Sequence, residues 1–131
     1  MPIRSDPSSW NDPRHRRGLE GEEIAKAFLK EAGWRILDHR FRMGRLETDL
    51  VVRKGKVVAF VEVKMRLTTR FGPPALAVTW HKQREIGRVA QAWIDRYGRP
   101  DDRYRFDVIA ITQARGLRKI EHIADAFRLG R

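Results

Sequence analysis

Three carboxylates and a lysine are the residues of this chain whose types and spacing could do chemistry. Glu47 and Asp49 are next-but-one neighbours in one run, and Glu62 and Lys64 are next-but-one neighbours at the end of a valine-rich run. Residues spaced in this way on a β-strand point to the same side. Carboxylate oxygens are the ligands that Mg²⁺ and Mn²⁺ prefer, and a chain without cysteines offers no thiolate. The pattern therefore indicates a divalent-metal site beside a lysine.

This site depends on a hairpin that brings the two runs together. Lys54-Gly55 suits a two-residue hairpin loop. In that register Glu47 faces Glu62. Asp49 then faces Phe60. Facing side chains lie about 5 Å apart and diagonal ones about 7–8 Å, so the carboxylates repel one another unless a cation neutralises them. The opposite side of the hairpin is almost wholly apolar and must be buried: Leu46, Thr48, Leu50, Val52, Val57, Ala59, Val61 and Val63.

A second interpretation fits the same spacing. The carboxylates would then belong to a solvated strand end and pair with Lys64 and neighbouring arginines, without a metal. The acid-x-lysine ending on a strand with apolar neighbours favours the metal site. Spacing alone does not separate the two interpretations.

Several other polar residues also have two explanations. Glu22 lies at the edge of an apolar helix stripe, where a carboxylate needs a partner, and it equally fits an acid favoured by the helix dipole. Gln83 lies on the inward stripe of a second helix, where it would orient water or phosphate or cap a core edge. Asp107 lies within an apolar strand and is expected to pair with an arginine. The histidines show no ligand spacing and are expected to be solvated or structural: His15, His39, His81 and His122.

The elements that position these residues follow from hydrophobic periodicity. Helices are predicted where apolar residues recur at three- and four-residue spacing, over Leu19–Ala32 and Thr79–Tyr97. Strands are predicted over Trp34–Arg42, Leu46–Arg53, Lys56–Lys64, Tyr104–Thr112 and Arg118–Ile123. Short turns make the first three strands antiparallel, and the long helix that follows predicts a crossover to a parallel neighbour. The order α-β-β-β-α-β-β predicts an α/β fold with a mixed sheet flanked by helices.

Composition limits the class of protein. The 131 residues suffice for one domain, expected over residues 18–131, after a mobile basic tail over Met1–Arg17. The formal net charge of +11 attracts polyanions. No apolar run approaches the roughly 20 residues of a membrane span, and no signal-peptide core is present. Together with the absence of cysteines, these features predict a cytoplasmic protein that binds nucleic acid and has no membrane partner.

Short motifs along the chain resemble a known family when they are taken together. They are Arg17-Gly18-Leu19-Glu20-Gly21-Glu22, Glu47-Thr48-Asp49-Leu50, Phe60-Val61-Glu62-Val63-Lys64, Phe71-Gly72, Lys82-Gln83-Arg84 and Arg105-Phe106-Asp107-Val108-Ile109. The acid, spacer and acid-x-lysine order fits the restriction-endonuclease-like (PD-(D/E)XK) superfamily. The whole set resembles the YraN-like family of predicted endonucleases, distant relatives of Holliday-junction resolvases, over roughly Arg17 to Phe127. The chain departs from the family at Leu46-Glu47-Thr48-Asp49, where Gly-Glu-Ile-Asp is usual, and this puts the local turn in question.

The resemblance implies a metal-dependent endonuclease with a restriction-endonuclease-like mixed sheet. Asp49 and Glu62 would hold Mg²⁺, or Mn²⁺ in its place, and Lys64 would position or activate water. Glu22 would complete the site from the first helix, and Gln83 would assist. The substrate would be structured or branched DNA in preference to RNA. The resemblance to resolvases also predicts a homodimer, because cutting two strands of a junction requires two sites.

Basic residues lie on the segments that flank the acids. Those we expect to contact nucleic acid are Arg42, Arg45, Arg66, Arg70, Lys82, Arg84 and Arg88. Solubility alone would explain them, but the net charge of +11 favours a track for phosphates. No motif that reads base sequence is present, so recognition of backbone or shape is expected. Three functions follow: a phosphodiesterase, a non-catalytic nucleic-acid-binding module, and a protein-interaction domain whose charge serves solubility.

Overall fold

The computed structural model describes residues 13–67 and 78–129, with side chains described from Gly18 onward. Two helices and five strands follow one another along the chain. They are α1 (Pro13–Glu31), β1 (Arg35–Met43), β2 (Leu46–Lys54), β3 (Val57–Arg66), α2 (Trp80–Tyr97), β4 (Arg103–Ala114) and β5 (Leu117–Phe127). The predicted α-β-β-β-α-β-β order is confirmed. No helix of the described residues is long and apolar enough to cross a membrane.

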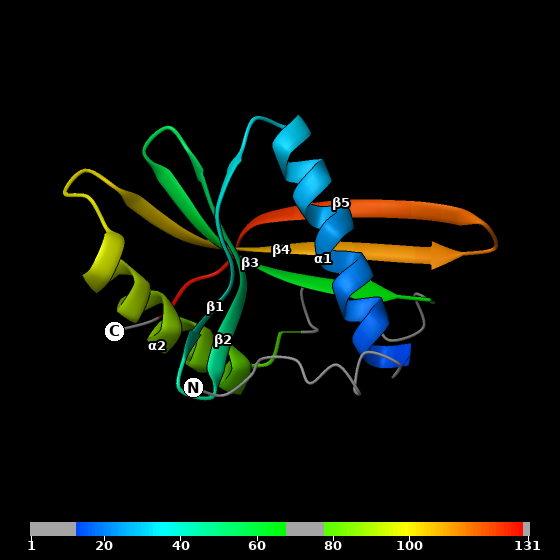
Figure 1. The fold of residues 1–131 in the computed structure, drawn as a ribbon, viewed down its shortest axis with the longest axis horizontal. Coiled ribbons are helices and arrows are strands. Elements are labelled where there is room, and N and C mark those ends of the chain that lie inside the picture. Colours follow the sequence, from blue (N-terminus) through cyan, green and yellow to red (C-terminus); the bar gives the residue numbers. More distant parts are fainter. Residues whose placement is uncertain (1–12, 68–77, 130–131) are drawn as a thin grey trace.

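The five strands form one mixed sheet in the order β1-β2-β3-β4-β5 (Figure 1). β3 and β4 pair in parallel, and every other neighbouring pair is antiparallel. The connection from β3 to β4 contains α2, because parallel neighbours need a long crossover that a tight turn cannot supply. β4 and β5 form a long hairpin that extends away from the two helices at its tip (Figure 1).

The hairpin β2–β3 is buried on both faces. Successive side chains along each strand point to opposite faces, and one face packs against α1 while the other packs against α2. On one face, Ala25 and Leu29 of α1 pack against a predicted apolar side that includes Leu50, Val52, Ala59 and Val61. On the other face, Ala90 and Trp93 of α2 pack against Val51, Val58 and Phe60. The predicted division of the hairpin into two sides is therefore confirmed. The predicted acids share the α2 side, where the strands continue beyond the aromatic core.

The register of this hairpin differs from the predicted one by two residues. Lys54 pairs with Val57, so the loop is Gly55-Lys56 and not Lys54-Gly55. Gly55 has a φ of 62°, a left-handed conformation that glycine adopts without strain. Val51 pairs with Phe60, so the predicted pairing of Asp49 with Phe60 is wrong. A shift by two residues preserves the side on which every side chain emerges.

The first helix begins earlier than the periodicity indicated. α1 starts at Pro13, not at Leu19, and residues 13–17 therefore belong to the helix and not to the expected tail. Proline is common at the start of a helix because its missing N–H would have no partner there. Residues 1–12 lie outside the described part of the chain.

Buried ion pairs outside the predicted metal site join neighbouring parts of the sheet. Asp107 accepts hydrogen bonds from Arg105 at 2.9 Å and contacts His122 Nε2 at 2.7 Å, which confirms its expected pairing with an arginine. Arg53 donates two hydrogen bonds to Asp102, at 2.7 and 2.9 Å, and this contact holds the pKa of Asp102 to about 2. His122 links Asp107 of β4 to β5, and Arg53 of β2 reaches Asp102 just before β4, so the role of these contacts is structural.

Candidate functional site

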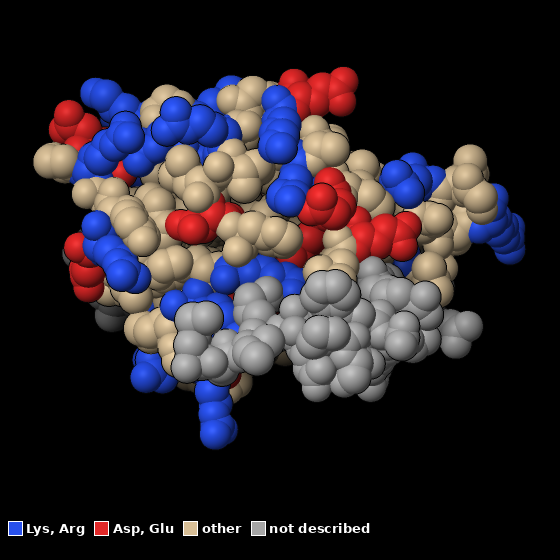
Figure 2. All heavy atoms as spheres, viewed as in Figure 1, with Lys and Arg blue, Asp and Glu red and all other residues tan. Residues whose placement is uncertain are grey.

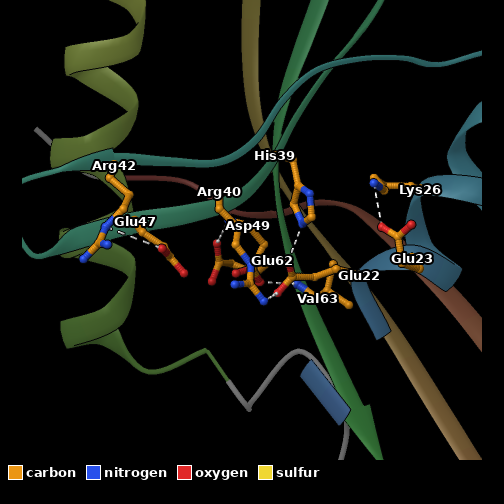
Figure 3. A network of polar contacts seen from close by, with 10 residues as sticks. All are labelled: Glu22, Glu23, Lys26, His39, Arg40, Arg42, Glu47, Asp49, Glu62 and Val63. Carbon is orange, nitrogen blue, oxygen red and sulfur yellow. Dashed lines mark hydrogen bonds and ion pairs between the residues drawn. The ribbon is translucent and has the colours of Figure 1, made fainter. Parts of the chain in front are cut away.

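Two carboxylates meet where β2 and β3 run side by side. The register that pairs Leu50 with Val61 continues to place Asp49 across from Glu62. The Val63 N–H donates to Asp49 Oδ2 at 2.8 Å, and the Asp49 N–H donates to Glu62 Oε2 at 3.4 Å. The predicted pairing of Glu47 with Glu62 is thus wrong, and Asp49 takes that place. Figure 3 shows Asp49 and Glu62 adjacent between the two helices.

Burial makes this carboxylate pair unusual. Glu62 is only 2% exposed, whereas Asp49 is partly exposed. Burial, together with the neighbouring negative charge of Asp49, raises the pKa of Glu62 to about 8 from its ordinary value of 4.5. Burial also raises the pKa of Asp49, against the hydrogen bond from Val63. Two carboxylates in this environment do not both ionise at neutral pH unless a cation joins them.

The donor set fits a hard divalent cation. Mg²⁺ is commonly held by one or two carboxylates and completes its coordination with waters and substrate phosphates. Asp49 and Glu62 supply two such carboxylates, of which Asp49 is the more exposed. Over residues 18–67 and 78–129, no cluster of three histidine, cysteine, aspartate or glutamate side chains is arranged to hold a metal ion. Water or substrate would have to complete the coordination.

Two lysines flank the carboxylate pair. Lys64 follows Glu62 on the same side of β3, as the strand alternation predicts. Lys82 approaches from the first turn of α2, and for Glu62 its charge acts more strongly than that of Lys64. Both lysines oppose the rise in the pKa of each carboxyl, although burial outweighs them. Sequence reasoning assigned Lys82 only to a phosphate track, because its distance from β3 depends on how α2 packs on the sheet.

Glu22 is held by other partners. Its carboxylate, 6% exposed, accepts hydrogen bonds from Arg40 at 2.6 and 3.1 Å and contacts His39 Nε2 at 2.5 Å. Arg40 has a φ of 59°, a left-handed conformation that is uncommon for arginine, at a point where β1 runs beside Asp49 of β2. Figure 3 shows Arg40 and His39 reaching Glu22 from β1. Arg40 therefore links Glu22 to the part of the sheet that carries Asp49. The prediction that the Glu22 carboxylate needs a partner is met by Arg40 and His39.

Gln83 and Thr48 have roles that the sequence left open or missed. The Gln83 side-chain amide donates to the Val78 carbonyl at 3.0 Å, which fits the predicted alternative of a cap at the edge of the core. Thr48, assigned to the apolar side, is fully buried, and its hydroxyl donates to Glu62 Oε2 at 3.4 Å. A buried threonine in an otherwise apolar run was the one sequence signal for this contact.

A basic cleft shares Lys82 with the surroundings of the carboxylate pair, although neither carboxylate lines it. It has a volume of about 370 Å³ and is lined by Arg40, Arg42, Arg45, Leu46, Glu47, Lys82 and Glu85. Three of the predicted nucleic-acid contacts, Arg42, Arg45 and Lys82, thus come together from β1, the β1–β2 turn and α2. Arg84 and Arg88 lie on the exposed side of α2, and Arg66 ends β3. Arg70 lies outside the described residues. Figure 2 shows many more basic side chains spread over one face of the molecule.

Comparison with known proteins places the chain among close relatives. It is 49% identical to the UPF0102 protein GSU0650 of Geobacter sulfurreducens, over 86% of this chain and 88% of that protein. It is 46% identical to a UPF0102 protein of Pelobacter propionicus, over 96% of this chain and 93% of that protein. The model of the Uncharacterised protein family UPF0102 matches residues 21–111, which confirms the resemblance to the YraN-like family. The chain therefore belongs to the UPF0102 family.

Proposed function

We propose that this protein is a metal-dependent endonuclease that hydrolyses phosphodiester bonds in structured or branched DNA. The observation that carries the proposal is the pair Asp49 and Glu62, which face one another with raised pKa values and two lysines beside them. A basic cleft of about 370 Å³, lined by Lys82 and by Glu47 of the same strand as Asp49, suits a phosphate backbone. In the proposed reaction, the pair holds Mg²⁺, for which Mn²⁺ can substitute.

Each side chain has a separate task in this proposal. Asp49 and Glu62 bind the cation, which when bound polarises the phosphate and lowers the pKa of water. Lys64 orients the attacking water and takes part in its deprotonation. Lys82 and the cleft arginines neutralise the phosphates on either side of the scissile bond. Glu22 fixes Arg40 at the border of the cleft, and Gln83 fixes the start of α2.

A second candidate function has its own support. Glu22 is engaged by Arg40 and His39, and no third carboxylate joins the pair among the described residues. This arrangement favours a nucleic-acid-binding module that keeps the fold and the basic cleft without turnover. The cleft and the net charge of +11 suit both candidates equally.

A cleavage panel separates the two candidates. We expect the protein to cut branched DNA, linear duplex and single strands to different extents with Mg²⁺ or Mn²⁺, and to cut nothing in EDTA. RNA of the same sequences tests the preference for DNA. Asp49→Ala, purified in the same way, should be inactive and excludes a contaminating nuclease. Binding without any cleavage by the wild-type protein would establish the second candidate instead.

Binding is expected to depend on the charges of the basic cleft. Arg45→Gln combined with Lys82→Gln should weaken binding to duplex DNA and reduce the log–log salt slope by about 1.8, because each neutralised phosphate contributes about 0.9. The matched control, Arg118→Gln with Lys119→Gln, removes the same charge from the start of β5, at the basic tip of the hairpin (Figures 1 and 2). Salt titrations by fluorescence anisotropy measure both. Equal effects of the two double variants would show that total charge, and not the cleft, governs binding.

The assembly is part of the proposal. We place the protein in the cytoplasm as a homodimer, since two cuts in a junction require two sites and two-fold pairing is the commonest symmetry. Light scattering at high concentration, alone and with branched DNA, measures the mass; a monomer in both conditions would remove this part.

A further inference from the structure

Among the described residues, two large aromatic side chains are exposed, Trp80 and to a lesser extent Tyr97. Trp34 and Trp93 are buried, whereas Trp80, at the start of a helix, is 70% exposed. Tryptophan is highly buried on average, so an indole exposed to this extent is a candidate for contact with a ligand. Trp80 opens α2, one turn from the residues that reach the basic cleft and the carboxylate pair.

The indole is presented on a rigid support. The Thr79 side chain caps α2 by accepting a hydrogen bond from the Lys82 N–H at 3.1 Å. This cap fixes the backbone of the first turn of an 18-residue helix, so the indole is presented from an ordered backbone position. A ring that is already positioned loses little conformational freedom on binding.

The surroundings of Trp80 are basic. The Arg84 guanidinium lies over its ring, 5.0 Å from the centroid, and leaves most of the side chain exposed. Arg88 follows at the same four-residue spacing, so both arginines share one side of α2 with the indole. Lys82, two residues on and therefore on the opposite side of the helix from the indole, lines the basic cleft. An exposed aromatic ring among cations suits a ligand that is both flat and anionic.

We infer that Trp80 is a stacking platform for an unpaired nucleobase of DNA bound along α2, an inference that rests on the proposed function. Exposed aromatic rings within basic grooves bind single strands because every base has a face that can stack. In a continuous duplex those faces are already stacked on neighbouring base pairs. The ring therefore selects DNA that carries an unpaired base, as at a flap, gap or junction. The arginines on α2 hold the phosphates of that strand.

Paired substrates test the inference. One is a blunt fluorescein-labelled duplex, and the other is the same duplex with a single-stranded flank. Affinities are measured by anisotropy in EDTA, so that binding is observed without turnover. Wild-type protein should prefer the flanked duplex. Trp80→Ala should lose about 5- to 150-fold in affinity for the flanked duplex and little for the blunt one. Trp80→Phe should recover most of the preference, because a smaller ring still stacks.

A matched control and a second readout complete the test. Leu117→Ala removes a comparably exposed apolar side chain, 76% exposed, at the β4–β5 turn and should change neither affinity. Light scattering of Trp80→Ala asks whether the ring instead joins two copies of the chain. The inference is overturned if Trp80→Ala loses affinity equally for both substrates or for neither. It is also overturned if the wild-type protein does not prefer the flanked duplex, or if Trp80→Ala changes the protein from a dimer to a monomer. If the protein cleaves DNA with Mg²⁺ but Trp80→Ala binds both substrates like the wild type, the inference fails and the proposed function stands. If Trp80→Ala loses affinity for the flanked duplex but the wild type cleaves nothing, the proposed function fails and the role of Trp80 in binding stands.

Discussion

Removing either carboxylate of the pair is expected to abolish magnesium binding and DNA cleavage together. The Lys64→Ala variant, in contrast, should still bind the metal but cleave DNA much more slowly. Asp49→Asn or Glu62→Gln leaves one carboxylate, too few ligands to displace the waters of Mg²⁺ with useful affinity. Lys64 supplies no ligand oxygen, so its loss spares the metal. A positioned proton-transfer group contributes about a hundred- to ten-thousand-fold in rate, and Lys64→Ala should lose a factor in that range. Calorimetric metal titration paired with cleavage assays measures both quantities.

Glu47→Gln is the matched control for these variants. Glu47 lies on the same strand and the same side as Asp49, but it is half-exposed and lies 3.7 Å from Arg42 Nε. Its removal should leave magnesium affinity within a small factor of the wild-type value. The assignment of ligands is wrong if Asp49→Asn binds magnesium as the wild type does. The assignment of Lys64 is wrong if Lys64→Ala cuts at an undiminished rate.

The side of the β2–β3 hairpin on which each candidate ligand lies was predictable from sequence. Which residue of β2 pairs with which residue of β3 was not. Strand alternation has a period of two, so an error of two residues in the hairpin register left Asp49 and Glu62 on the predicted side. The register itself depends on which residue takes the positive φ of the turn. Gly55 takes it as the first residue of the loop, and a sequence reading that placed it second shifted every partner. The shift matters for chemistry, because it replaces Glu47 by Asp49 as the neighbour of Glu62.

Contacts between elements could not be read from periodicity. Glu22 was correctly placed at the edge of a buried stripe, but its contact with Arg40 depends on a left-handed backbone conformation at a non-glycine residue. The approach of Lys82 to the carboxylates depends on how the start of α2 is held over the sheet, which its own sequence does not specify. The exposure of Trp80 follows from the same placement. Local patterns thus determined the elements, whereas the packing between elements determined the site.

The stability of the protein without metal is expected to fall as pH rises from about 4.5 to about 8, and Glu62→Gln should remove much of this fall. The pKa of Glu62 is about 8 in the folded protein and near its ordinary 4.5 in the unfolded chain. The folded state therefore holds this proton more tightly, and its advantage is complete below the ordinary pKa and lost through pH 8. Within that window one such group costs about 1.4 kcal/mol of unfolding free energy per pH unit. At pH 8 and above, Glu62→Gln should be the more stable protein.

Magnesium should reverse this loss in the wild type alone. The cation binds the ionised pair of the folded state, so it competes with the proton and its affinity should rise with pH up to about 8. At a hundred times its dissociation constant, a ligand specific for the folded state adds about 2.7 kcal/mol of stability. Urea unfolding from pH 5 to 9, with and without Mg²⁺, measures both effects, with Glu47→Gln as the control that keeps the wild-type pH dependence. If wild-type stability instead rises from pH 5 to 8, or if Mg²⁺ stabilises Glu62→Gln as much as the wild type, then the pair is not the place where protons and metal compete. If Glu62→Gln gains stability and loses metal binding, then Glu62 serves metal binding and lowers the free energy of unfolding of the protein without metal.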